Sequence, residues 1–533
     1  MHKDHYDKRE GTQVNNKNII IGTAVGIAAL IATVGVTIAR KKEPKTAKAS
    51  YAMYNRERLV KAVKEQLEDV NLELVRSKAD FIIDRSVEEI QEAIRENELN
   101  YEMLMAFYLD RILTFDQSEN GINGISEINP EAMNLARKCD ASPVVEKGIL
   151  FGIPVTVKEN INTDDMITSV GTHILREHIP TEDADVVKRL KEAGAIILGK
   201  TNLSELANYM GPKMPSGYSS KHGQTLNPYK PLKLSPLGSS SGAGTSTTVN
   251  IGALALGTET TGSIVAPAAY TSIVGFKPSI HRTEGEGVFP LATSLDVVGP
   301  MTKNVIDAVY GYNAIVADRL NRIDPDDVKA ANLDGKRIGV VQDNHAMTQL
   351  AIESLRQAGA EVTEIEFDTD TIDNIIVINA EFNKDVQAYA KKHQLPFNTL
   401  EELIEYNKED LSVRGKYGQG HVVAAAETEH NQAVVDEMIQ NASAHYDDLI
   451  DKYQLDSIAY LDYAGTLVTA VAGYPEISIP LGLDEDGAPH GLTITAEMNE
   501  DEKVLQLGYA FEQHHQGRYR LTDDELKDHL QNA

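Results

Sequence analysis

The sequence has no tryptophan and only one cysteine, Cys139, among its 533 residues. A single cysteine excludes an intramolecular disulfide and a zinc site built from cysteines. Aromatic residues make up only 6% of the chain, so a hydrophobic core must be mostly aliphatic. Basic residues are also few, because 51 Lys and Arg stand against 80 Asp and Glu, for a net charge of −29. Nucleic-acid binding needs clustered positive charge, so this balance predicts that nucleic acid is not a partner.

One long uncharged run lies near the N-terminus, at residues 19–39. Its length matches the ~20 apolar residues that a helix needs to cross a bilayer, and exceeds the ~7–15 of a cleaved signal peptide. We therefore expect a polar tail at 1–18, a transmembrane helix at 19–39, a linker at 40–54 and one large domain at 55–533. More basic residues follow the run than precede it, which favours a single-pass protein with its large domain in the cytoplasm.

Helical and strand-like patterns alternate along the large domain, which predicts an α/β fold with a mixed or parallel sheet. Ser86 followed by Glu89 indicates a capping box at the start of one helix. The helical pattern covers residues 56–98, 101–113, 184–193, 242–255, 346–358, 422–453 and 502–514. Strand patterns lie at 149–157, 195–198, 336–341, 361–366, 458–461, 477–479 and 492–496. The Gly- and Pro-rich residues 211–238 predict an ordered loop.

Two serines, Ser239 and Ser263, lie in a stretch of glycine and other small residues, and Lys158 ends an apolar run upstream. Serine is a weak nucleophile until a base removes its proton, and lysine is a base only when it is neutral. Burial at the end of an apolar strand lowers a lysine pKa. A second serine could relay the proton, and backbone N–H groups of a Gly-rich turn could bind an oxyanion. The pattern therefore predicts a hydrolytic Ser-Ser-Lys site.

The order of these motifs resembles the amidase signature family. The resemblance covers most of residues 55–515. It is carried by GILFGIPVTVKENINTDD (148–165), MPSGYSSKHGQTLNPY (214–229), SPLGSSSGAGTSTTVNIGALALGTETTGSIVAPAAYTSIVGFKPS (235–279), LDVVGPMTKNVIDA (295–308) and AGYPEISIPLG (472–482). It implies a central mixed sheet flanked by helices and hydrolysis of a linear carboxamide in a small molecule or peptide. It implies no metal and no organic cofactor, and it makes a homodimer one option.

The resemblance also implies a role for each residue of the site. Lys158 would be the base, Ser239 the relay with a cis peptide before it, and Ser263 the nucleophile that forms an acyl-enzyme. Ser240 competes for the relay role. The backbone amides of Thr260, Thr261 and Gly262 would form the oxyanion hole. Substrate specificity would come from the variable residues 311–460.

Some positions depart from the family pattern. Thr261 stands where a glycine is usual, and a β-branched residue fits there only if its φ stays negative. Val265 stands where an arginine is frequent, the usual Gly-Gly before the serines is Leu237-Gly238, and Ala470 replaces a polar residue. These changes leave room for reduced or altered activity.

Three alternative functions remain open at this point. The sequence Gly238-Ser-Ser-Ser-Gly242 also fits the nucleophile elbow of an α/β-hydrolase, with Ser240 as nucleophile and a later histidine such as His281, His345 or His490 as base. One branch of the amidase signature family is the A-type subunit of a tRNA-dependent amidotransferase, but the apolar run at 19–39 and the TETTGS and MPSG variants favour a free amidase or peptide amidase. The third alternative is a catalytically inactive, membrane-anchored binding protein on an amidase scaffold.

Overall fold

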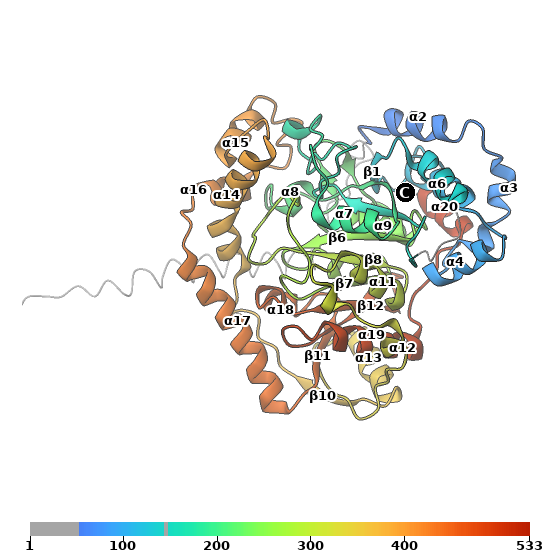
Figure 1. Ribbon diagram of the computed structural model, residues 1–533. Coiled ribbons are helices and arrows are strands. Elements are labelled where there is room, and N and C mark those ends of the chain that lie inside the picture. The colour runs from blue at the N-terminus through green and yellow to red at the C-terminus, as the bar shows by residue number, and fades with distance from the viewer. Residues whose placement is uncertain (1–52, 143–147, 533) are drawn as a thin grey trace, which may run out of the picture. The chain divides into compact units, whose positions relative to one another are not determined.

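The computed structural model describes residues 53–142 and 148–532. Within these ranges one mixed sheet of eleven strands runs through the fold in the order β1-β3-β2-β6-β8-β7-β12-β13-β11-β9-β10, with a separate two-stranded sheet of β4 and β5 (Figure 1). The large sheet contains β1 (Ile125–Ile128), β2 (Pro154–Lys158), β3 (Ile196–Thr201), β6 (Leu254–Glu259), β7 (Val274–Lys277), β8 (Val297–Thr302), β9 (Arg337–Val341), β10 (Glu361–Ile365), β11 (Ser457–Leu461), β12 (Glu476–Leu483) and β13 (Pro489–Thr495). The small sheet pairs β4 (Tyr218–Ser219) with β5 (Gly223–Gln224).

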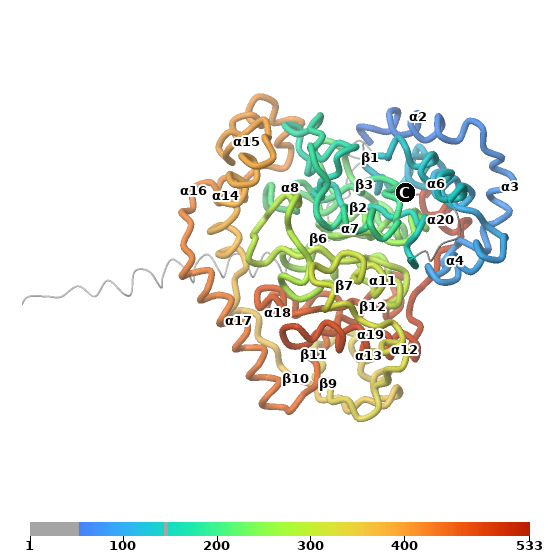
Figure 2. The backbone as a smooth tube through the Cα atoms, viewed as in Figure 1, coloured from blue at the N-terminus to red at the C-terminus, as the bar shows by residue number. Residues whose placement is uncertain are grey.

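The sheet is parallel near both ends and antiparallel across its middle. Strands β3, β2 and β6 are parallel neighbours, as are β11, β9 and β10. The strands between β6 and β11 pair antiparallel. Figure 2 follows this order from β1 at the top of the view down to β9 and β10. The expected α/β fold with a mixed sheet is therefore confirmed.

Helices surround the sheet in groups. The described helices are α2 (Arg56–Gln66), α3 (Leu72–Arg76), α4 (Val87–Arg95), α5 (Tyr101–Arg111), α6 (Ala132–Ala141), α7 (Asp185–Glu192), α8 (Glu205–Asn208), α9 (Ser241–Thr248), α10 (Val265–Tyr270), α11 (Val305–Ile315), α12 (Pro325–Lys329), α13 (Ala346–Gln357), α14 (Asn374–His393), α15 (Leu400–Lys408), α16 (Gly420–Glu427), α17 (Gln432–Tyr453), α18 (Thr466–Val471), α19 (Asp501–His515) and α20 (Asp523–Gln531). Short 3-10 or π turns lie at η2 (Ala79–Phe81), η3 (Ile112–Asp116), η4 (His173–Leu175) and η5 (Arg319–Asn321).

The C-terminal helix α20 lies beside the N-terminal helices, as Figure 1 shows at its right-hand edge. Leu526 and Leu530 of α20 are buried in the same hydrophobic cluster as α2 to α6. The Arg111 guanidinium forms an ion pair with Asp523 at 2.9 Å. A second cluster is built mainly on α14 to α17, and a third on α11, α13, α19 and strands β9, β11, β12 and β13. Each group of helices thus packs in its own hydrophobic cluster.

Most predicted elements are present with shifted ends. The capping box is confirmed, because the Ser86 side chain accepts from the Glu89 amide and the Glu89 carboxylate accepts from the Ser86 amide. The predicted helix at 242–255 is too long, since α9 ends at Thr248 and β6 begins at Leu254. Small apolar residues fill both segments, and such residues suit a buried helix and a buried strand equally well. The sequence pattern therefore hides that boundary.

The expected membrane helix at 19–39 lies outside the described residues. Among the residues that are described, no helix has the length and the apolar character required to cross a bilayer.

Gly242 allows α9 to approach the sheet closely. A Cβ atom at this position would lie 2.3 Å from the Gly124 carbonyl oxygen and 2.5 Å from that of Asn202. Both neighbours are backbone atoms, so they cannot move aside as a side chain can. We expect Gly242→Ala to lower the free energy of unfolding by about 3 kcal/mol or more, measured by urea denaturation.

Gly420→Ala is the matched control for this prediction. Gly420 begins α16, and the nearest atom to an added Cβ would be the Pro212 Cδ at 3.4 Å. Alanine favours a helix over glycine by about 1 kcal/mol, so this variant should be as stable as the parent or slightly more stable. Equal losses in both variants would contradict the close-approach explanation.

Candidate active site

Lys158 ends strand β2 and lies inside the protein. Its side chain is 0% exposed, between the parallel neighbours β3 and β6. The Nζ atom lies 2.7 Å from Ser239 Oγ and donates to Thr258 at its Oγ1 (2.8 Å) and its carbonyl oxygen (3.0 Å). The predicted base and relay are therefore in direct contact, and Thr258 on β6 holds the base in place.

The apolar run that leads into Lys158 has the expected electrostatic effect. Burial lowers the pKa of Lys158 to about 7, against the weaker opposing influence of Asp296 and Glu259. A free lysine side chain has a pKa of ~10.4. A substantial fraction of Lys158 is thus neutral near pH 7, the form that can accept a proton.

Ser239 and Ser240 occupy different environments although they are adjacent. The peptide bond between Gly238 and Ser239 is cis. The Ser239 hydroxyl contacts Lys158, whereas Ser240 Oγ donates to the Thr258 carbonyl at 3.1 Å and accepts from the Thr258 amide at 3.3 Å. The geometry thus favours Ser239 over Ser240 as the partner of the lysine. Across the described part of the chain, no histidine is hydrogen bonded to Ser240, so the elbow alternative lacks its base.

Ser263 lies on the turn between β6 and α10. The Ser240 amide donates to the Ser263 carbonyl at 3.2 Å, which ties this turn to the start of α9. The side chain is 7% exposed. Within residues 53–142 and 148–532, no hydrogen bond joins Ser263 Oγ to another side chain or backbone group. The candidate nucleophile is held through its backbone while its hydroxyl stays free.

The backbone amides of the turn are not equivalent. The Gly262 amide donates to Glu259 Oε1 at 2.8 Å, so it is not a free donor for an oxyanion in this geometry. Of the expected oxyanion donors Thr260, Thr261 and Gly262, the Gly262 amide is thus already hydrogen bonded to a carboxylate. The amides of Thr260, Thr261 and Ser263 have no acceptor among the described residues.

The backbone of Thr261 has the conformation that a β-branched residue requires. Gly262 takes the positive φ of the turn, at 77°, and Thr261 does not have a positive φ. The Thr261 hydroxyl instead accepts from Asn374 Nδ2 at 3.2 Å. Asn374 is the first residue of α14, so the threonine connects the nucleophile turn to that helix.

Comparison with known proteins decides the family. The family model described as Amidase matches residues 103–414. The chain is 33% identical over 469 residues to a probable amidase from Arabidopsis thaliana, across 81% of this chain and 90% of the relative. The chain belongs to the amidase signature family. The protein is therefore an amidohydrolase that acts on amides.

Other relatives show the range of the family. An amidase family protein from Bacillus anthracis is 38% identical with a TM-score of 0.86, covering 88% of this chain and 99% of that one. The native peptide amidase from Stenotrophomonas maltophilia is 31% identical with a TM-score of 0.77, covering 82% and 98%. The A-type subunit of the glutamyl-tRNA(Gln) amidotransferase from Symbiobacterium thermophilum is 30% identical over 492 residues, covering 79% and 99%.

Glu259 is a residue of this amidase site that sequence reasoning missed. Its buried carboxylate accepts from three amides that flank the nucleophile, those of Gly262 (2.8 Å), Ile264 (2.7 Å) and Val265 (3.1 Å). The Thr466 hydroxyl also lies 3.4 Å from Glu259. A carboxylate that accepts several amides fixes a turn firmly, because such charge-assisted bonds are strong. The only sequence signal was a charged residue inside a stretch of otherwise neutral residues.

Thr466 links this turn to a second buried carboxylate, Glu476. The Thr466 hydroxyl donates to Glu476 at 2.9 Å, and the Tyr460 hydroxyl donates to the same oxygen at 2.5 Å. Burial raises the pKa of Glu476 to about 7, with Lys277 acting in the opposite direction. This network lies behind the nucleophile turn and supports Glu259.

A cavity of about 520 Å³ is lined in part by Thr258, a residue that contacts Lys158. Asp296 lies in its wall, and burial raises the pKa of this carboxyl group to about 7. The cavity continues along α14 and the loop before β8. Its lining includes Asn160, Thr258, Thr260, Phe289, Leu291, Asp296, Asp385, Tyr389 and Lys392. The mixture of apolar and polar groups is typical of a small-molecule site.

The Glu259 contacts lead to a testable expectation. Glu259→Gln keeps the shape of the side chain but replaces one accepting oxygen with an NH₂ group, which faces amide donors. We expect kcat to fall about 10- to 100-fold and the free energy of unfolding to fall by about 2 kcal/mol, measured by steady-state kinetics and urea denaturation. A variant with unchanged kcat would show that the carboxylate does not position the nucleophile turn.

Two groups of side chains in the described residues have the composition of metal ligands. Glu127, Glu159 and His222 form a buried group. Its centre already contains a cation, since Lys221 Nζ lies 3.0 Å from Glu127 and 3.5 Å from Glu159. The second group is His345, Asp484 and His490, which has no residue in common with the contacts of Lys158, Ser239 and Thr258.

Proposed function

We propose that this amidase hydrolyses a linear carboxamide to a carboxylate and ammonia or an amine through an acyl-enzyme on Ser263. The observation that carries the proposal is the contact of 2.7 Å between Lys158 Nζ and Ser239 Oγ, at a lysine whose pKa burial lowers to about 7. Such a lysine can work as a base at neutral pH. The free hydroxyl of Ser263 supplies the nucleophile on a turn fixed by Glu259.

The proposed reaction moves one proton along the two serines. As Ser263 Oγ attacks the amide carbon, its proton passes to Ser239 Oγ while the proton of Ser239 passes to neutral Lys158. Backbone amides of the turn stabilise the developing oxyanion. The proton then returns by the same route to the amide nitrogen, the C–N bond breaks and ammonia or amine leaves. Water repeats the sequence on the seryl ester and releases the carboxylate.

For the substrate we favour a peptide amide over other small amides. The peptide amidase from Stenotrophomonas maltophilia is among the similar solved structures at 31% identity. The cavity lined by Thr258 and Thr260 is large enough for one or two amino-acid side chains and is lined in part by α14. This helix falls within residues 311–460, which we expect to determine specificity.

Ammonia release from a panel of amides tests this proposal. The panel contains C-terminally amidated dipeptides, benzamide and free glutamine, each at equal concentration, with Ser263→Ala protein as the blank. We expect the dipeptide amides to be hydrolysed most efficiently. Fast release from benzamide alone would contradict the peptide assignment but leave the mechanism intact.

A role within a tRNA-dependent amidotransferase is the second candidate function, because the A-type subunit from Symbiobacterium thermophilum is 30% identical to this chain. It predicts preferential hydrolysis of glutamine and a need for partner proteins. The uncharged run at 19–39 favours a free amidase. Activity of the isolated protein on peptide amides, with little on glutamine, would reject the amidotransferase role. No turnover of any amide would instead favour the inactive binding protein.

We also propose that residues 19–39 anchor the protein in a membrane, with residues 55–533 as one catalytic domain on the cytoplasmic side. The support is the length and uniform apolarity of the run and the basic residues that follow it. Flotation of full-length protein with liposomes, against a fragment starting at residue 49, tests this. Equal flotation of both proteins would reject the anchor.

A further inference from the structure

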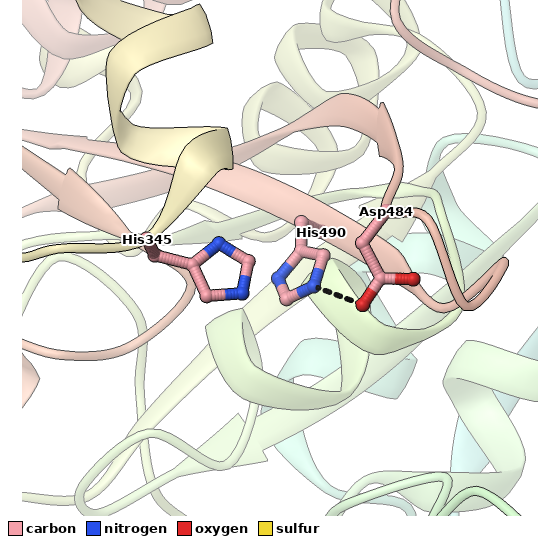
Figure 3. A group of neighbouring side chains, drawn as sticks. All are labelled: His345, Asp484 and His490. Carbon is pink, nitrogen blue, oxygen red and sulfur yellow. Dashed lines mark hydrogen bonds and ion pairs between the residues drawn. The ribbon is translucent and has the colours of Figure 1, made fainter.

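The group of His345, Asp484 and His490 joins three separate elements. His345 is the N-cap of α13, Asp484 lies on the turn after β12, and His490 lies on β13. Figure 3 shows the His490 ring between the His345 ring and the Asp484 carboxylate, with a dashed line from His490 to Asp484. One potential ligand atom from each residue lies within 4.8 Å of the others. A small inward movement would bring all three into contact with one ion.

His490 is oriented as a metal ligand usually is. Its Nδ1 lies 2.8 Å from Asp462 Oδ2, and the other oxygen of Asp462 accepts the Gly491 amide at 2.9 Å. A carboxylate that accepts a hydrogen bond from Nδ1–H keeps the proton on Nδ1 and leaves the Nε2 lone pair for a cation. Metal-binding histidines show this arrangement in most sites.

Asp484 is oriented by its own turn. Its Oδ1 accepts the Ala488 amide at 2.8 Å, which leaves Oδ2 directed at His490 Nε2 at 3.4 Å (Figure 3). This separation is long for a charge-assisted hydrogen bond, which is about 2.7–2.9 Å. It is close to the distance between two ligands of a tetrahedral zinc ion, about 3.3 Å for metal bonds of about 2.0–2.1 Å. The pair is spaced for a shared ion.

His345 completes the set from the opposite side. Its ring centroid lies 4.8 Å from that of His490. Its Nδ1 accepts the Met347 amide at a long 3.2 Å, which places the proton of the neutral ring on Nε2. Coordination through Nε2 would move that proton to Nδ1 and exchange this one capping bond for a metal bond. The cap is the only described hydrogen bond of the ring that the exchange would remove.

The charge around the group is unbalanced. Asp462 and Asp484 bring two carboxylates together, and no lysine or arginine within the described ranges forms an ion pair with either. The buried group of Glu127, Glu159 and His222 differs, because Lys221 already supplies its positive charge. Among the described residues, only His490 forms ion pairs with Asp462 and Asp484, so two carboxylates share a single potentially positive side chain.

We propose that His345, Asp484 and His490 bind one zinc ion, with water as the fourth ligand. Two imidazoles and one carboxylate are the donors that zinc prefers. The ion would fasten the β12–β13 turn to the start of α13 and would take no part in amide hydrolysis. Binding displaces any proton on His490 Nε2 to solvent.

The test uses full-length, tag-free protein stripped with a chelator and titrated with Zn²⁺ and, separately, Co²⁺. We expect one Zn²⁺ per chain, a rise in Tm with Zn²⁺ concentration and the visible absorption of four-coordinate Co²⁺. His345→Asn removes the imidazole but keeps a good N-cap residue, and Asp484→Asn keeps the shape of its side chain. Each should weaken Zn²⁺ affinity at least 100-fold, and Asp462→Asn, which acts through His490, about 10- to 100-fold.

His529→Ala serves as the control, because His529 lies outside the group and its Nδ1 contacts the Pro228 carbonyl. It should leave Zn²⁺ affinity unchanged. Amide hydrolysis by His345→Asn and Asp484→Asn confirms that both variants are folded. Absence of a stoichiometric site, or Zn²⁺ affinity that survives in both variants, would overturn the proposal.

Discussion

Replacing Ser263 with alanine is expected to lower kcat for amide hydrolysis by at least about 10⁴-fold, because no other group can form the acyl-enzyme. The Ser263 hydroxyl makes no hydrogen bond to another described residue, so its loss leaves no buried partner unsatisfied. The free energy of unfolding should therefore stay within about 0.5 kcal/mol of the parent value. Kinetics on a peptide amide and urea denaturation on the same preparation measure both quantities.

A fluorophosphonate probe identifies the nucleophile independently of the substrate. We expect the parent protein to carry one adduct on Ser263, mapped by peptide mass spectrometry, and Ser263→Ala to carry none. Ser240→Ala is the matched control, since the described hydrogen bonds of the Ser240 side chain go only to the backbone of Thr258. It should still be labelled at Ser263. An adduct on Ser240 would restore the nucleophile elbow, and a folded protein without any adduct would support the inactive scaffold.

The parts of the site that follow from one strand or one motif could be predicted from sequence. The apolar residues before Lys158 and the β-branched residues among them predicted a buried strand, and burial is also what lowers its pKa. The position of Ser239 and Ser263 in one small-residue stretch, with Lys158 upstream, predicted a Ser-Ser-Lys site. The structure places Ser239 against Lys158 and connects the backbones of Ser240 and Ser263. In this part of the site, the local sequence pattern was sufficient to predict both the buried strand and the lysine at its end.

The features that depend on distant segments could not be predicted in this way. Sequence shows Glu259 next to the turn but not that the Gly262 amide donates to its carboxylate. Asn374, more than 100 residues away, meets Thr261 only because α14 folds back over the turn. The order of the strands is similarly hidden, since antiparallel β8 separates β6 from β7. Each of these facts is set by tertiary packing.

The pH dependence of catalysis should identify Lys158 as the base. Because its folded pKa is about 7, the neutral fraction rises with pH through that value. We expect kcat/KM to increase about tenfold per pH unit below pH 6 and to level off above pH 8. Lys158→Met should lower kcat/KM about 10²- to 10⁴-fold and abolish this rising limb, measured from pH 5 to 9 on one peptide amide.

Lys200 provides a matched control for the Lys158 variant. It is also fully buried, one strand away on β3, and burial lowers its pKa to about 7. Its Nζ donates to the Ile161 carbonyl at 2.9 Å and to Thr168, and it forms no hydrogen bond with Ser239. Lys200→Met should therefore keep the rising limb at the same pH. A limb that disappears in Lys200→Met and survives in Lys158→Met would show that Lys158 is not the base.

The stability of Lys158→Met should change in the opposite sense to its activity. A lysine whose folded pKa is about 7 binds fewer protons than the unfolded chain, where the pKa is ~10.4, so stability rises with pH between these two values. Below pH 7 the full cost of burying the lysine is present. Methionine at position 158 carries no such cost, so Lys158→Met should flatten this part of the stability profile and raise Tm at pH 6. An inactive variant with a higher Tm has lost its base and not its fold, which separates a catalytic role for Lys158 from a structural one.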